Sequence, residues 1–205
     1  MLRRLGWIIP VLLLLSVSAK ADTVYFNGGY AFGDHGVGIP PYQGTLDGQN
    51  ASFYCVDFDH DITGNTSWQV TVTDVTSGAD YSGTRLMNQT DYFEIAWLLD
   101  QAIASGNQTT QAELQWAVWS FSGGGDPYGT NNTLLTDAAN ALPGYTPANW
   151  EILTPTGTYG QEFMVKVPPN TNNIPPVNTP EPSGFALLSM GLAGLAIAGR
   201  RKLVA

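Results

Sequence analysis

The segment "DYFEIAWLLDQAIASGNQTTQAELQWAVWSF", residues 91–121, decides the fold class, because it holds two helical patterns in a chain whose flanks read as strands. In its first half, apolar residues recur three and four positions apart between Phe93 and Ile103, which is the spacing of a helix. They cover more than one face. We therefore expect a largely buried helix that ends at Gly106.

The second half predicts another helix, one that is buried on every side. Thr110 and Glu113 have the spacing of a capping box, and the helix should run to about Phe121, before the glycines at 123–125. Its segment "LQWAVWSF" is apolar nearly all the way round. Gln115 lies in the middle of this segment, and a buried glutamine costs about 1–3 kcal/mol for each polar group left without a partner.

Segments on both sides of the helices have the pattern of strands. In "SWQVTVTDV", Trp68, Val70 and Val72 alternate with polar residues. We predict strands over residues 23–30, 51–59, 67–75 and 160–167, and a third, short helix over 132–142. This order predicts an α+β protein, with a β-sheet or barrel-like body and an inserted pair of buried helices.

The charge of the body, residues 22–182, excludes some partners. All 17 acidic residues of the chain lie there, against only two cations, Arg85 and Lys166, which gives a formal charge of −15. A nucleic-acid binder needs cations that replace the counterions of the phosphates, so we expect no nucleic-acid partner. Binding to an anionic lipid surface is disfavoured for the same reason.

The N-terminus, "MLRRLGWIIPVLLLLSVSAKA", has the composition of a secretory signal. Arg3 and Arg4 precede an apolar run over residues 5–17, and Ala19-Lys20-Ala21 has the form of a cleavage site. We predict a signal peptide over residues 1–21. The alternative is an uncleaved membrane anchor.

The C-terminus has three parts in order: Pro180-Glu181-Pro182, an apolar stretch over 183–199, and Arg200-Arg201-Lys202. The apolar stretch is near the lower length limit for a transmembrane helix, and the trailing cations favour a cytoplasmic end. We predict a single transmembrane helix over 183–199, preceded by a Pro/Asn-rich linker over 168–179.

This tail resembles the PEP-CTERM sorting signal of Gram-negative envelope proteins. The resemblance covers about residues 180–205 and implies processing by an exosortase, a membrane transpeptidase. It also implies a link to extracellular polysaccharide and biofilm matrix. The expected location is the cell envelope or extracellular matrix, with anchoring in the inner membrane before processing.

Cys55, within "SFYCVDFDHD", is the only cysteine of the chain. A thiol can attack the side-chain amide of a glutamine and expel ammonia, which leaves an internal thioester. Such an acyl electrophile hydrolyses in water, so it needs a dry, aromatic environment. The candidate pocket residues are Phe53, Tyr54, Trp116 and Trp119.

The two segments together resemble bacterial surface thioester domains. Tyr54-Cys55-Val56-Asp57 matches that family's cysteine motif on a strand, and residues 114–119, with Gln115, match its glutamine motif on a helix. The resemblance covers roughly residues 53–121 of a predicted 22–167 domain. It implies a Cys55–Gln115 cross-link that captures an amine on a partner molecule. Capture happens once, so the chain is not expected to be an enzyme or to need a cofactor. The well-described members are Gram-positive wall proteins, unlike the tail of this chain.

Three other interpretations remain. The main alternative is a non-catalytic structural protein of the exopolysaccharide or biofilm matrix, with Cys55 and Gln115 as plain core residues. A cysteine peptidase would need a histidine base, but only His35 and His60 exist, and His60 should point away from Cys55 along the same strand.

A calcium site is the third. Asp57, Asp59 and Asp61 would share one face of a regular strand, but Ile62 and Trp68 stand where an EF-hand loop needs Gly and Glu. No metal site is therefore assigned. Two interpretations of these carboxylates remain: a looser calcium site built from oxygen ligands, or a solvated acidic end of the strand.

Overall fold

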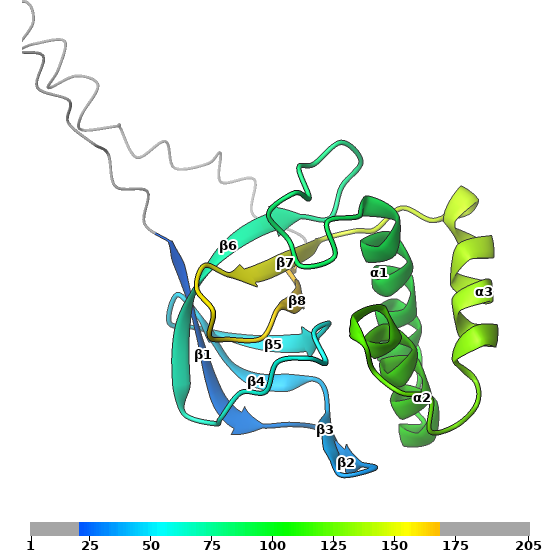
Figure 1. Ribbon diagram of the computed structural model, residues 1–205, viewed down its shortest axis with the longest axis horizontal. Coiled ribbons are helices and arrows are strands. Elements are labelled where there is room, and N and C mark those ends of the chain that lie inside the picture. The colour runs from blue at the N-terminus through cyan, green and yellow to red at the C-terminus, as the bar shows by residue number, and fades with distance from the viewer. Residues whose placement is uncertain (1–20, 169–205) are drawn as a thin grey trace, which may run out of the picture. The chain divides into compact units, whose positions relative to one another are not determined.

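The body is a closed antiparallel barrel with three helices beside it (Figure 1). The computed structural model describes residues 21–168. Six strands close the barrel in the order β1-β4-β5-β8-β7-β6. Their bounds are β1 Asp22–Gly29, β4 Tyr42–Leu46, β5 Gln49–Cys55, β6 Thr66–Asp74, β7 Trp150–Pro155 and β8 Phe163–Lys166. The α+β class and the barrel are confirmed.

The sequence analysis did not predict several of the strands. β4 and β7 were not predicted, and neither was the small hairpin of β2 (Phe32–Asp34) and β3 (Val37–Ile39). β4 pairs with both β1 and β5, and β7 with both β6 and β8, so the barrel closes only through them.

The strand predicted over 51–59 is too long. β5 ends at Cys55, and the next backbone amide, Val56 N–H, donates to Glu162 O at 3.2 Å. From there the chain turns, and the Asp57 side chain becomes buried. The alternation of aromatic, apolar and acidic residues over 51–59 has the pattern of one long strand. The chain leaves the sheet before Asp57, whose carboxylate is buried.

All three helices are inserted between β6 and β7, and Figure 1 shows them on one side of the barrel. They are α1 (Gln89–Ala104), α2 (Gln108–Trp119) and α3 (Asn131–Ala141), with short 3-10 turns at Ser120–Ser122 and Leu142–Gly144.

The predicted cap of the second helix is wrong. α2 begins after Asn107, whose Oδ1 accepts a hydrogen bond from Thr110 N–H at 3.1 Å. Asn107 is therefore the N-cap, and Thr110 is the third residue of the helix. An asparagine satisfies the free amides of a first helical turn at least as well as a threonine does.

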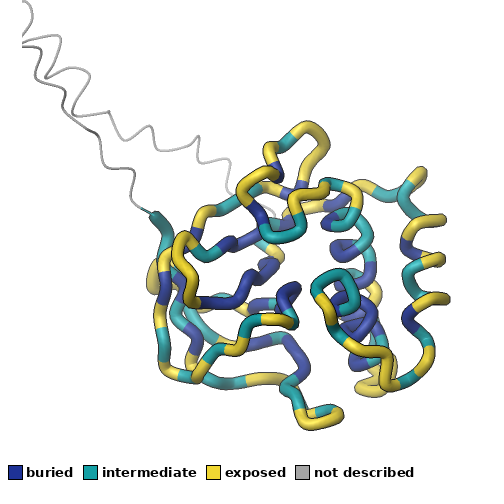
Figure 2. The backbone as a smooth tube through the Cα atoms, viewed as in Figure 1, coloured by how far each residue is buried: buried dark blue, intermediate teal, exposed yellow. Residues whose placement is uncertain are grey.

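Two cores meet at α2. One fills the barrel, where Ala112, Trp116 and Trp119 join the inward side chains of the strands. The other lies between the outside of the barrel and the helices, where α2 contributes Leu114, Ala117 and Val118. Because α2 faces both cores, nearly all of its second half is buried, as its sequence predicts (Figure 2).

The signal peptide, the linker and the predicted transmembrane helix lie outside the described residues, apart from Ala21 and Pro168. Within residues 21–168, no helix is long and apolar enough to cross a membrane.

The corrected cap gives the first prediction. Asn107→Ala should lower the free energy of unfolding by about 1 kcal/mol, because the Thr110 amide loses its acceptor. Thr110→Ala should change it by less than about 0.5 kcal/mol, because no helix amide depends on that side chain. Urea unfolding followed by circular dichroism measures both, and a larger loss for Thr110→Ala would contradict the assignment.

Candidate functional site

Cys55 lies at the point where β5 leaves the barrel. It is the last residue of the strand, opposite Phe163 on β8, and is 1% exposed. The Sγ–H group donates to Asp57 O at 3.3 Å. Burial raises the pKa of the Cys55 thiol to about 12, against smaller lowering effects of the Asp57 backbone and the Trp119 indole. The thiol is therefore protonated at neutral pH.

Gln115 reaches this strand end from α2. It is 2% exposed, and its Nε2 donates to Cys55 O at 2.8 Å. Figure 1 shows the tip of β5 directed at α2. The structure thus brings the two predicted site residues together, 60 positions apart in the sequence, with the glutamine amide against the backbone of the cysteine.

Three of the four predicted pocket aromatics surround the sulfur side of this contact. Phe53, Trp116 and Trp119 are buried in the same core as Cys55. The two indoles meet edge to face with ring centroids 5.1 Å apart, and Phe53 stacks on Phe163 at 5.3 Å. These rings keep water from the thiol.

Tyr54 lies on the other face of β5. Its ring meets Trp150 edge to face at 5.5 Å, as strand alternation requires. It still borders the site, because Tyr54 and Gln115 line a cavity of about 230 Å³. We name this cavity the glutamine slot. Its lining residues are Ile39, Pro40, Pro41, Tyr54, Ala102, Ile103, Gln111 and Gln115.

A buried ion pair holds the turn that follows Cys55. Asp57 Oδ2 lies 2.7 Å from Arg85 Nε, and Oδ1 lies 2.8 Å from His60 Nδ1. The Asp57 side chain is only 3% exposed, so these partners offset the cost of burying its charge. Since Asp57 O accepts the bond from Cys55 Sγ, this ion pair also positions the thiol.

A second buried carboxylate, Glu162, lies beside the first. Its oxygens accept hydrogen bonds from Tyr92 Oη, from Thr154 Oγ1 at 2.6 Å and from Arg85 N–H at 3.0 Å. Its own amide donates to Asp57 Oδ2 at 3.3 Å. Burial raises the pKa of Glu162.

Sequence reasoning missed this network. One signal was available: Arg85 is one of only two cations in the body.

The geometry also bears on the peptidase and calcium interpretations. His60 is not on the strand, and its ring contacts Asp57 and Arg85 rather than Cys55. His35 lies 2.8 Å from Asp34, against the rings of Trp116 and Tyr128. Neither histidine is presented as a base to the thiol.

Asp57, Asp59 and Asp61 do not share a strand face, because β5 ends at Cys55. The Asp57 carboxylate is already held by Arg85. Within the described part of the chain, no three acidic, histidine or cysteine side chains form a cluster that could hold a metal ion.

Comparison with known families gives a match to residues 178–202. The chain carries a PEP-CTERM protein-sorting motif. This motif agrees with the three-part tail seen in the sequence, and it implies export, sorting to the cell envelope and processing by an exosortase. Among curated proteins, none matches the chain.

A solved structure that is similar to this chain is the N-terminal thioester domain of a surface protein from Clostridium perfringens. The match has 14% sequence identity and a TM-score of 0.41, and it covers 72% of this chain and 99% of that one.

The buried ion pair gives the second prediction. Arg85→Met should lower the free energy of unfolding by about 3 kcal/mol, because Asp57 would keep a buried charge without its cation. Lys166→Met is the matched control, since its partner Asp100 is 22% exposed, and it should cost less than about 1 kcal/mol. Urea unfolding at neutral pH measures both. Equal losses would show that Arg85 does not stabilise a buried charge.

Proposed function

We propose that this chain is an envelope-sorted extracellular protein with an internal thioester between Cys55 Sγ and the side-chain carbonyl carbon of Gln115. The bond makes the body a one-time covalent trap for an amine on a partner molecule. Adhesion to that partner, in the extracellular matrix or on another surface, is the resulting function. Because each molecule reacts once, it is not an enzyme.

The observation that carries this proposal is the 2.8 Å contact between Gln115 Nε2 and Cys55 O. The accepting oxygen and the sulfur belong to the same residue, and both reacting side chains are almost fully buried. Bond formation requires reacting atoms about 3–3.5 Å apart in a dry site. Rotation of the two side chains is the expected path from the hydrogen-bonded pair to that geometry.

The proposed closure is balanced and needs no external oxidant or reductant. The Cys55 sulfur attacks the Gln115 carbonyl carbon, the C–N bond breaks, and the thiol proton leaves with the nitrogen as ammonia. The product has neither a buried thiol nor buried amide hydrogens. A neutral thioester therefore suits this core better than the polar pair from which it forms.

In the capture step the sulfur, which was the nucleophile during closure, becomes the leaving group. A neutral primary amine attacks the same carbonyl carbon, an amide forms, and the sulfur leaves as a thiol after it receives the proton of the amine. The glutamine slot supports this route, because Gln115 lines it while Cys55 is not among its lining residues. Its apolar walls, among them Pro41 and Ile103, favour an unbranched alkyl amine in its uncharged form.

The sorting motif supports the location of this chemistry. The apolar stretch at 183–199 would hold the chain in the inner membrane until an exosortase processes it near Pro180-Glu181-Pro182. A role in a polysaccharide or biofilm matrix belongs to the same proposal.

The third prediction is a mass. The purified chain should weigh one ammonia less than the sequence that remains after its signal and tail are processed, and methylamine should add one methylamine to Gln115 while it releases one thiol. Because burial raises the pKa of this thiol, it should be counted with maleimide after denaturation. Intact mass spectrometry before and after methylamine gives both results.

Matched variants distinguish the loss of the thioester bond from a general effect of substitution in this part of the fold. Cys55→Ala and Gln115→Ala should each restore the mass expected from the sequence. Gln111→Ala should keep the ammonia deficit, because Gln111 lines the same slot but donates to Ser105 O. A wild-type chain at full mass with one titratable thiol would leave the structural matrix protein, with Cys55 and Gln115 as core residues, as the function.

A further inference from the structure

A larger cavity lies at the barrel end near the small hairpin, with Trp119 in its wall. Its volume is about 550 Å³, which is within the usual range for small-molecule sites. We name it the barrel-end cavity. Its lining residues are Phe26, Gly28, Tyr30, Gly36, Val37, Gly38, Tyr42, Phe58, Asp61, Ile62, Gly64, Trp119 and Gln161.

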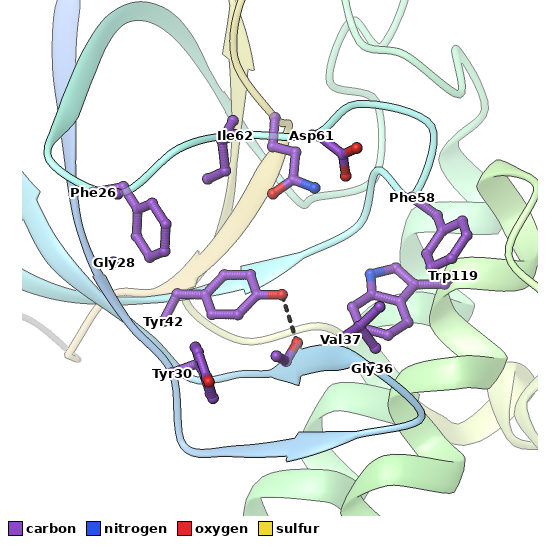
Figure 3. Close-up of a pocket in the computed structure, with 13 residues that line it drawn as sticks. Phe26, Gly28, Tyr30, Gly36, Val37, Tyr42, Phe58, Asp61, Ile62 and Trp119 are labelled. Atoms are coloured by element: carbon purple, nitrogen blue, oxygen red, sulfur yellow. Dashed lines mark hydrogen bonds between the residues drawn. The ribbon is translucent and has the colours of Figure 1, made fainter.

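Aromatic rings form two sides of this cavity. Figure 3 shows Phe26, Tyr30 and Tyr42 on one side and Phe58 and Trp119 on the other. Most of these rings are fixed in place. Tyr42 Oη donates to Gly38 O at 2.7 Å, Phe26 and Tyr42 lie 5.5 Å apart, and Phe58 contacts Trp119 at 5.4 Å.

The charge around the cavity has one sign. Asp61 is the one charged residue among its lining residues, and Figure 3 shows it at the rim. The two cations of the body are engaged elsewhere, Arg85 with Asp57 and Lys166 with Asp100. With a formal charge of −15 on the body, the field attracts cations and repels anions.

We propose that the barrel-end cavity is a reversible binding site for an organic cation, an alkylated ammonium group. Aromatic faces attract a cation through their negative π-systems, and a carboxylate at the rim adds a Coulomb contribution. An alkylated ammonium sheds water easily and offers apolar surface to Phe26, Val37 and Ile62. A small metal ion would meet only one carboxylate among these lining residues.

This site is separate from the proposed covalent trap. Neither Cys55 nor Gln115 lines the barrel-end cavity, and the glutamine slot shares no lining residue with it. A quaternary ammonium has no N–H and cannot be acylated by a thioester. Binding of such a probe therefore tests this inference whether or not the thioester exists.

The fourth prediction uses radiolabelled choline and the purified full-length chain in a non-ionic detergent at low salt. Equilibrium dialysis should show saturable, reversible binding, to the wild type and to Cys55→Ala alike. The neutral isostere of choline, in which a tert-butyl group replaces the trimethylammonium, should compete at least about tenfold more weakly, because it lacks the cation–π attraction.

Two variants test the walls, each with a control of the same chemical change. Asp61→Asn should weaken choline binding about three- to fivefold, whereas Asp137→Asn, on the exposed side of α3, should not. Tyr30→Leu should weaken it by a similar factor, whereas Tyr159→Leu, an exposed tyrosine outside the cavity, should not.

Tyr30 and Asp61 are both exposed, so neither variant should disturb folding. Absence of saturable binding would overturn the proposal. So would equal competition by the neutral isostere, or an unchanged affinity in both Asp61→Asn and Tyr30→Leu.

Discussion

The burial of the second half of α2 on all its faces is the constraint on which the rest of the structure depends. A helix with Trp116 and Trp119 on one side and Leu114, Ala117 and Val118 on another needs two separate apolar environments. The interior of the barrel supplies one, and the core between the outside of the barrel and the helices supplies the other. A helix so placed must cross the end of β5, where the strand stops at Cys55. The contact between Gln115 and Cys55 therefore follows from apolar burial and is not an addition to the fold.

The buried carboxylates have a complementary role, since they determine where β5 stops. Asp57 and Glu162 are 2% and 0% exposed, and together they collect donors from segments far apart in the sequence. A carboxylate in such a place stabilises the fold only when its hydrogen bonds are complete, so a small displacement of the turn would be costly. This explains why a turn without regular structure can hold the Cys55 thiol in a fixed position.

Periodicity along the chain predicted the helices, and the resemblance of two motifs to thioester domains predicted the meeting of Cys55 with Gln115. They did not predict β4, whose sequence "YQGTL" is short and has a central glycine. That glycine is required, because a Cβ there would lie 2.0 Å from Tyr25 O on β1. Nor could they predict Arg85 beside Asp57 or Glu162 beneath Tyr92, since contacts across tens of residues leave no periodic trace. The predicted N-cap of α2 was wrong for a simpler reason. Asn107 and Thr110 are both good caps, and only the fold selects between them.

For the proposed function, the buried environment of the sulfur also favours capture of an amine over the reverse reaction. The thiolate is the nucleophilic form of cysteine, and a pKa of about 12 leaves it a very small population at neutral pH. After an amine has been captured, the released sulfur stays protonated in its aromatic core and attacks the new amide slowly. The same burial slows the first closure, but there the leaving group is ammonia, which diffuses away and does not return at an appreciable concentration. A captured amine remains covalently attached to Gln115. Ammonia departs after closure, whereas the captured partner stays attached. A buried, weakly acidic thiol therefore suits an amide bond that forms once and is not reversed.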